Sequence, residues 1–208
     1  MKTMKTGIIY SSHHGTTETV AKEIQSQLQP LVVELVNLSD DKHLDLSNYD
    51  VVILGSSIHA SHNQSVMQNF CRKNMPELLQ KQVGLFLCCM NKAEREQSMQ
   101  NAYSEMLRNH AFSIQFMGGE YKMDKMNFIE RILLKKIAGV TESKSSIDQE
   151  AINQFVEKIK EQLMKIEKTL IHRITLNYKQ LEKEGAAKID YRDTLTGFML
   201  YFESRSFV

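Results

Sequence analysis

The chain has 208 residues, of which 42% are hydrophobic and 25% are charged, and its formal net charge is +1. This length supports a real hydrophobic core, and the composition excludes a disordered chain. The near-neutral charge does not indicate a nucleic-acid partner, and no run approaches the roughly 20 apolar residues of a membrane helix.

The first half of the chain alternates apolar runs with amphipathic segments. The run at 49–55 is nearly all apolar, which is typical of strands buried on both faces of a parallel sheet. In chain order we expect a strand at 6–10, a helix at 17–28 ended by Pro30, strands at 31–38 and 49–55, a loop at 56–64 and a helix at 65–73.

The second half continues the alternation and predicts an α/β fold, a doubly wound five-stranded parallel sheet with helices on both faces. Ligands of such sheets bind beyond the carboxyl ends of the strands. The expected elements are a strand at 82–90, a helical segment at 92–109 with a loop at its start, a strand at 111–118, and helices at 126–138 and 147–166.

The C-terminal segment exceeds what five strand–helix units require. We expect a domain at 1–166 and a C-terminal extension at 167–208, in which 168–184 extends the last helix. An apolar cluster at 198–202 has two open interpretations: it docks on the body, or it pairs with another subunit in a homo-oligomer.

Three cysteines, Cys71, Cys88 and Cys89, occur without a repeating spacing. This pattern argues against a disulfide framework, and the lack of C-x-x-C argues against a zinc site. The first ten residues have no signal-peptide pattern. We therefore expect a cytoplasmic protein, either free or peripheral to the inner face of the membrane, with core thiols or, as the alternative, a redox role for Cys89.

A polar loop between the first strand and the first helix is the strongest functional signal. A helix N-terminus offers unpaired N–H groups and a positive dipole end, which suits a phosphate, and hydroxyls add donors. The alternative is an ordinary helix cap. Neither the triphosphatase pattern G-x-x-x-x-G-K-[ST] nor G-x-G-x-x-G after a strand is present. The expected phosphate-binding residues are Ser11, Ser12, His13, His14, Gly15, Thr16 and Thr17.

This loop resembles that of the flavodoxin family, Thr/Ser-x-Thr-Gly-x-Thr, at Ser12, Gly15 and Thr17, with His14 in place of a hydroxyl or acidic residue. The resemblance implies that the loop holds the phosphate of flavin mononucleotide (FMN). It also implies that the loops after the third and fourth strands hold the flavin ring. Those loops supply Ser56, Ser57, Ile58 and His59, and Cys89, Met90, Asn91 and Lys92.

The turn Gly55-Ser56-Ser57-Ile58, followed by His62 and Phe70, resembles the short bacterial protoporphyrinogen dehydrogenases of the flavodoxin type. The similarity covers roughly residues 5–165, including an insertion after the fifth strand. It implies an FMN oxidoreductase of heme biosynthesis that oxidises protoporphyrinogen IX, or a similar reduced substrate, and passes electrons to a quinone at the membrane surface. His59 is a weak candidate for a catalytic group.

Two alternatives to this enzyme remain: a flavodoxin-like electron-transfer module without its own substrate, and an interaction protein that has lost FMN. The chain has no Trp, no aromatic residue in either flavin loop, and none of the acidity that steers carriers toward basic redox partners. These departures favour the enzyme. No clustered set of His and carboxylate residues predicts a metal site.

The helix expected at 126–138 carries an apolar stripe flanked by basic residues. Two interpretations are open: it packs on the sheet, which we favour, or it rests on a membrane surface. The stripe contains Phe128, Ile129, Ile132, Leu133 and Ile137, with Arg131, Lys135 and Lys136 mostly off it.

Overall fold

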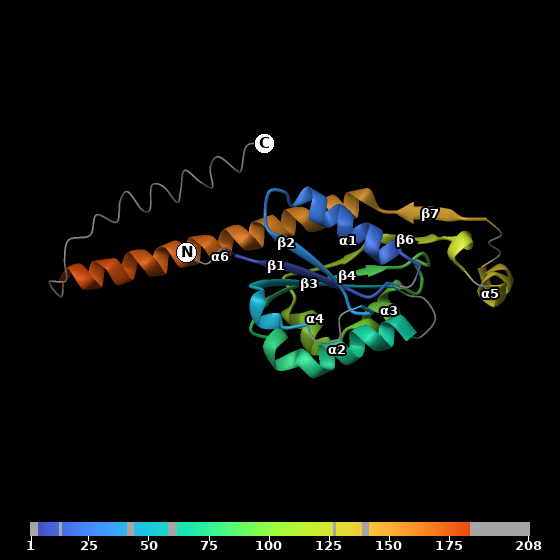
Figure 1. Ribbon diagram of the computed structural model, residues 1–208, viewed down its shortest axis with the longest axis horizontal. Helices are drawn as coiled ribbons and strands as arrows, with labels where there is room; N and C mark the ends of the chain where they lie inside the picture. The colour runs from blue at the N-terminus through green and yellow to red at the C-terminus, as the bar shows by residue number, and fades with distance from the viewer. Residues whose placement is uncertain are drawn as a thin grey trace. The chain divides into compact units, whose positions relative to one another are not determined.

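The structure, a computed structural model, describes residues 4–12, 14–40, 44–57, 62–126, 128–138 and 142–183. Its central sheet has five parallel strands (Figure 1). The fold class predicted from the sequence is confirmed. The strands lie in the order β2 (Val33–Asn37), β1 (Thr6–Tyr10), β3 (Val51–Ser57), β4 (Gln82–Cys88), β5 (Ser113–Phe116).

The chain first forms β2 on one side of β1 and then crosses to form β3 on the other side. The topological switch point, where ligands of doubly wound sheets bind, therefore lies at the carboxyl ends of β1 and β3. The connecting helices are α1 (Thr16–Gln27), α2 (His62–Leu78), α3 (Arg95–Ala102) and α4 (Glu105–His110), and α6 (Gln149–Lys183) follows the last strand.

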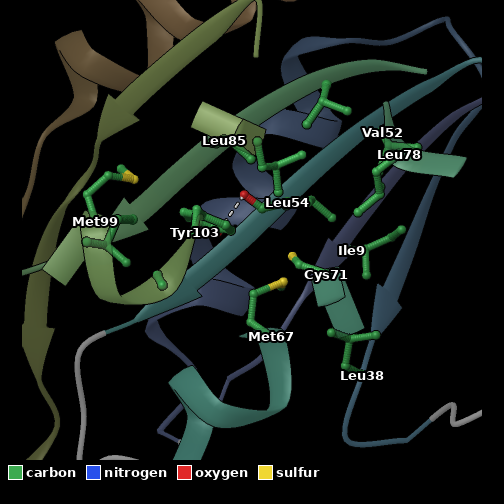
Figure 2. Close-up of a cluster of buried hydrophobic side chains, with 14 of the residues drawn as sticks. Ile9, Leu38, Val52, Leu54, Met67, Cys71, Leu78, Leu85, Met99 and Tyr103 are labelled. Atoms are coloured by element: carbon green, nitrogen blue, oxygen red, sulfur yellow. Dashed lines mark hydrogen bonds between the residues drawn. The ribbon is translucent and has the colours of Figure 1, made fainter. Parts of the chain in front are cut away.

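One face of the sheet packs against α2, α3 and α4 through a buried cluster, part of which Figure 2 shows. Met67 and Cys71 of α2 lie on this face with Leu54 and Leu85 of the sheet. The buried Tyr103, between α3 and α4, donates its hydroxyl to the carbonyl oxygens of Leu54 and Phe86, at 3.0 and 3.1 Å. This hydroxyl therefore bridges β3 and β4 from the helical layer.

The opposite face is covered by α1 and by the first turns of α6 (Figure 1). Phe155 of α6 meets Phe86 edge to face, with ring centroids 6.2 Å apart. Gly55 lies directly opposite the Phe86 ring, and a Cβ atom at Gly55 would lie 2.1 Å from its Cζ atom. Strand β3 therefore requires a glycine beside this ring.

Three expected boundaries in the middle of the chain were wrong. The helix expected at 65–73 spans His62–Leu78 and continues through Pro76, because Leu78 is fully buried on its inner face. The loop expected at 56–64 is shorter, since β3 extends to Ser57. The single helix expected at 92–109 is two helices, α3 and α4, separated where Tyr103 adopts extended backbone.

The fifth strand was also predicted too long. The expected strand 111–118 ends at Phe116, and Gly118 begins a second, two-stranded antiparallel sheet that the sequence analysis missed. This sheet pairs β6 (Gly118–Tyr121) with β7 (Lys144–Ile147), and between them lies α5 (Phe128–Ala138). The last helix begins at Gln149 rather than at 147 because the preceding residues belong to β7.

The favoured interpretation of helix α5, that its apolar stripe packs on the sheet, was wrong for the described side chains. Phe128, Ile129 and Ile132 are 76%, 75% and 51% exposed, so these side chains do not pack on the sheet. Figure 1 shows α5 beyond β6 and β7, away from the five-stranded sheet. The side chains of Leu133 and Ile137 lie outside the described residues.

The chain divides into two compact units, Met1–Ile159 and Lys160–Val208. The second unit is described over 160–183 and is helical throughout, as the C-terminal part of α6. The extension of the last helix predicted at 168–184 is therefore confirmed up to Lys183; the cluster at 198–202 lies outside the described residues. In the described part of the chain, no helix is long and apolar enough to cross a membrane.

Candidate functional site

The loop after β1 reaches the start of α1 through a glycine in a left-handed conformation. Gly15 occupies the N-cap position of α1 with φ 86° and makes no side-chain capping bond, because it has no side chain. Its backbone N–H instead donates to Ser12 Oγ at 3.1 Å, which closes the loop on itself. No serine or threonine of this loop therefore occupies the N-cap position of α1. This weakens the alternative that the loop is an ordinary helix cap.

Three buried hydroxyl groups at the carboxyl ends of the strands and the start of α1 have no hydrogen-bond partner among the described residues: Ser11, Thr17 and Ser56. All three side chains are at most 1% exposed. The backbone N–H of Ser11 donates to the Gly55 carbonyl at 3.1 Å, which ties the loop to β3. Since buried polar groups are normally paired, three unpaired donors at one sheet edge suit a polar ligand.

The remaining predicted phosphate residues are placed as follows. His14 and Thr16 are buried, at 6% and 3% exposure, and Thr16 Oγ1 donates to the Glu120 carbonyl at 3.5 Å. Ser12 is half-buried. His13 lies outside the described residues.

The first predicted flavin loop begins inside a strand. Ser56 and Ser57 are the last two residues of β3, where they pair with Leu87 and Cys88 of β4. Their side chains are buried, with exposures of 0% and 4%. Ile58 and His59 lie outside the described residues.

The second predicted flavin loop is organised by Asn91. Its side chain accepts a hydrogen bond from the Ala93 N–H at 3.0 Å and donates to Glu94 at 2.8 Å. Cys89 is buried and its thiol donates to the Asn91 carbonyl at 3.0 Å. Met90 is half-buried, and Asn91 and Lys92 are exposed. Loops 11–17 and 89–92 thus follow β1 and β4 at the same sheet edge.

The three cysteines are buried, which confirms their interpretation as core residues. Burial raises the pKa of Cys71 and of Cys88 to about 12, and the Thr17 hydroxyl lies close enough to Cys88 to oppose the rise, although the two groups do not have the geometry of a hydrogen bond. Burial also raises the pKa of Cys89. Because the thiolate is the reactive form, these shifts disfavour redox reactivity of the free thiols near neutral pH.

Strand β6 contributes to this site, and the sequence analysis missed it. The Cys89 N–H donates to the Gly118 carbonyl at 2.6 Å, and a Cβ atom at Gly119 would lie 2.9 Å from the Met90 nitrogen. Lys122, just beyond β6, donates to Thr19 Oγ1 on α1 at 3.3 Å. The adjacent Gly118-Gly119 pair was the available signal, because paired glycines mark close backbone approach.

Comparison with known proteins agrees with this arrangement. A family model described as a flavodoxin domain matches residues 7–148. The chain belongs to this flavodoxin-domain family. The matched segment contains the predicted phosphate loop, both predicted flavin loops and the β6–β7 sheet.

Among characterised relatives of this flavodoxin domain is a protoporphyrinogen IX dehydrogenase (quinone) of Leishmania major, 25% identical over 154 residues, 70% of this chain and 67% of the relative. The protein of the same name from Escherichia coli K12 is 24% identical over 171 residues, which are 75% of this chain and 94% of the relative. A solved structure, a flavodoxin of Streptococcus pneumoniae TIGR4, is 14% identical with a TM-score of 0.48, over 76% of this chain and 99% of that chain.

The arrangement is suited to holding an anionic ligand. The unpaired hydroxyls and the first turn of α1 supply hydrogen-bond donors at the switch point. Among the described residues, no group of three His, Cys, Asp or Glu side chains is placed to hold a metal ion.

Proposed function

We propose that this flavodoxin domain binds FMN, with the phosphate at the loop 11–17 and the ring between the loops after β3 and β4. The observation that carries this proposal is the set of buried, unpaired hydroxyls of Ser11, Thr17 and Ser56. Leaving such groups unpaired costs about 1–3 kcal/mol each, and a ligand that accepts their hydrogen bonds removes this cost. The family match supports a flavin as the ligand.

Thr17→Val tests the phosphate site, since valine has the same shape and lacks the hydroxyl. We expect FMN affinity to fall about 10- to 100-fold, the range for a lost hydrogen bond to a charged group. The free energy of unfolding of the FMN-free protein should stay the same or rise, because an unpaired hydroxyl is removed. Flavin fluorescence quenching and denaturant unfolding measure the two quantities.

Thr169→Val is the matched control, because Thr169 is exposed on α6 and donates only to the Lys165 carbonyl within its own helix. It should leave FMN affinity unchanged. Equal FMN affinity in the wild type and Thr17→Val would contradict the proposed phosphate site. Ser11→Ala, at the residue that follows β1, should reproduce the Thr17→Val effect.

We further propose that the chain is an oxidoreductase that oxidises protoporphyrinogen IX, or a similar reduced substrate, and passes the electrons to a quinone. The relatives named protoporphyrinogen IX dehydrogenase (quinone) support this reaction class. Bound FMN supplies the redox chemistry, and the protein supplies binding and orientation. Strand β6 supplies backbone surface beside the loop after β4.

Anaerobic mixing with protoporphyrinogen IX is expected to bleach the flavin absorbance, and a menaquinone analogue should restore it. This cycle separates an enzyme from an electron-transfer module, which would stay oxidised with the porphyrinogen and be reduced only by a redox partner. A flavin that stays oxidised with protoporphyrinogen would contradict the proposed substrate while leaving FMN binding intact.

We propose that helix α5 brings the site to an anionic membrane surface, where a quinone is met. Its exposed apolar side chains lie beside the exposed basic residues Arg131, Lys135 and Lys136, while Glu130 is the sole acidic residue in the helix sequence. An amphipathic helix of this kind binds at the headgroup level through apolar burial and attraction to anionic lipid.

Phe128→Ser combined with Ile129→Ser tests this surface by vesicle sedimentation. We expect the wild type to sediment with vesicles containing anionic lipid and the variant to lose at least about tenfold in affinity, because each buried large apolar side chain contributes about 1.5–3 kcal/mol. Met106→Ser, at a 59% exposed site on α4, is the control. Identical sedimentation of all three proteins would contradict the membrane role of α5.

A further inference from the structure

Strand β6 contacts two of the three loops that are proposed to hold FMN, loop 11–17 and loop 89–92. Its first residue, Gly118, accepts a hydrogen bond from the Cys89 N–H at 2.6 Å, and its third residue, Glu120, accepts one from the Thr16 hydroxyl at 3.5 Å. Figure 1 shows β6 beside the N-terminal end of α1. The strand is therefore in contact with both loops.

Alternation along the strand assigns its side chains to the two loops. Gly119 faces the Cys89–Met90 backbone, and Tyr121 lies on the same side, where burial first and then the charges of Cys89 and Glu94 raise its pKa. Glu120 and Lys122 lie on the other side. Lys122 Nζ donates to Thr19 Oγ1 in the first turns of α1, at 3.3 Å.

Glu120 and Lys122 form a largely buried ion pair beside the phosphate loop. Lys122 Nζ lies 3.0 Å from Glu120 Oε2, and the two side chains are 21% and 22% exposed. Oε2 is buried and makes no hydrogen bond of normal geometry, so the pairing is ionic. A cation near the N-terminus of a helix is disfavoured by the helix dipole, and Glu120 offsets that repulsion.

Loop 11–17 contains no lysine or arginine of its own. A phosphate monoester carries between one and two negative charges near neutral pH, about 1.5 to 2 by analogy with phosphorylated side chains. We propose that Lys122 is the counter-charge of the bound phosphate and that Glu120 opposes phosphate binding, so that this pair sets the affinity for the phosphorylated flavin. This inference rests on the proposed function and adds to it a charge-based selectivity for FMN over riboflavin.

A purely structural ion pair makes a different prediction from this one. If the ion pair only held β6 on α1, substitution of Lys122 and substitution of Glu120 would both weaken flavin binding. If the pair sets phosphate affinity, the two substitutions have opposite signs, because one removes an attraction and the other removes a repulsion.

The experiment measures the dissociation constants of FMN and of riboflavin by flavin fluorescence quenching, at low salt and at about 0.5 M salt. We expect Lys122→Gln to weaken FMN binding about tenfold and to leave riboflavin binding unchanged, since riboflavin has no phosphate. Glu120→Gln should strengthen FMN binding a few-fold. High salt should reduce both effects, because Lys122 and Glu120 are partly exposed.

Two further variants complete the set. Lys122→Arg keeps the charge and should stay close to the wild type in its preference for FMN over riboflavin. Lys144→Gln removes the same charge from an exposed position on β7, opposite Tyr121, and should change neither constant. Circular dichroism confirms that each variant is folded, and Glu120→Gln tests the sign even if Lys122→Gln does not fold.

Two outcomes would overturn the inference alone: an unchanged ratio of FMN to riboflavin affinity in Lys122→Gln, or weaker FMN binding in both Lys122→Gln and Glu120→Gln. A wild-type protein that binds neither FMN nor riboflavin would overturn the proposed function, and this inference with it.

Discussion

Replacing Gly55 by alanine is expected to destabilise the protein by about 3 kcal/mol, the upper part of the usual range for overpacking a core. A Cβ atom there would lie 2.1, 2.4 and 2.8 Å from three atoms of the Phe86 ring. The ring has little room to retreat, because Phe86 is fully buried and meets Phe155 edge to face. Denaturant unfolding measures the change.

Two comparisons isolate the contact between Gly55 and Phe86. Gly55→Ala combined with Phe86→Leu should be more stable than Gly55→Ala alone, because the smaller side chain leaves room for the new methyl group. Gly84→Ala should cost only about 1 kcal/mol, since a Cβ atom there would lie 2.9, 3.0 and 3.1 Å from Ile53, Phe112 and Phe155, much less close than at Gly55. Equal losses at Gly55 and Gly84 would show that the Phe86 ring moves freely.

Gly15→Val is expected to have the largest effect on FMN binding, with an affinity loss of more than about 100-fold. Gly15 has φ 86°, a conformation that a β-branched residue adopts only with strain of about 1–3 kcal/mol. Relief of that strain would move the N–H groups of the loop and of the first turn of α1 away from the phosphate. Fluorescence titration with FMN and thermal unfolding of the FMN-free protein test both consequences.

Gly15→Asn is the control for this substitution, because asparagine tolerates positive φ far better than valine. We expect FMN affinity within a few-fold of the wild type. A loop that only caps α1 would respond differently: asparagine would stabilise the helix as an N-cap, and neither variant would change flavin affinity. Wild-type affinity in Gly15→Val would therefore favour the cap.

The sequence alone was sufficient for the parts of the fold that depend on local pattern. The apolar runs of β1, β3 and β4 predicted strands, the run of β3 one buried on both faces, and the structure buries nearly all of their residues. The alternation of these runs with amphipathic helices predicted the parallel sheet. The polar loop 11–17 between a strand and a helix predicted the candidate phosphate site, because a helix N-terminus attracts anions wherever it occurs.

Tertiary structure decided the features that depend on long-range contacts. The chain departs from the sheet after β5 because Gly118 and Gly119 allow close approach to Ser146 and Met90, residues that no local pattern connects to them. Helix α5 has the apolar stripe of a packing helix, yet its Phe128 is 76% exposed. The period of a sequence shows which face of a helix is apolar, but it does not show whether another element covers that face.

The candidate site shows the same division. The hydroxyls of Ser11 and Thr17 could be read from the sequence, whereas their burial without partners required the neighbouring strand β3 and helix α1 to be in place. Lys122 is 103 residues from Thr19 in the chain, and only the folding of β6 against α1 brings the two side chains into hydrogen-bond contact. Sequence pattern thus determined the layers and the loop, and tertiary packing determined which charges face that loop.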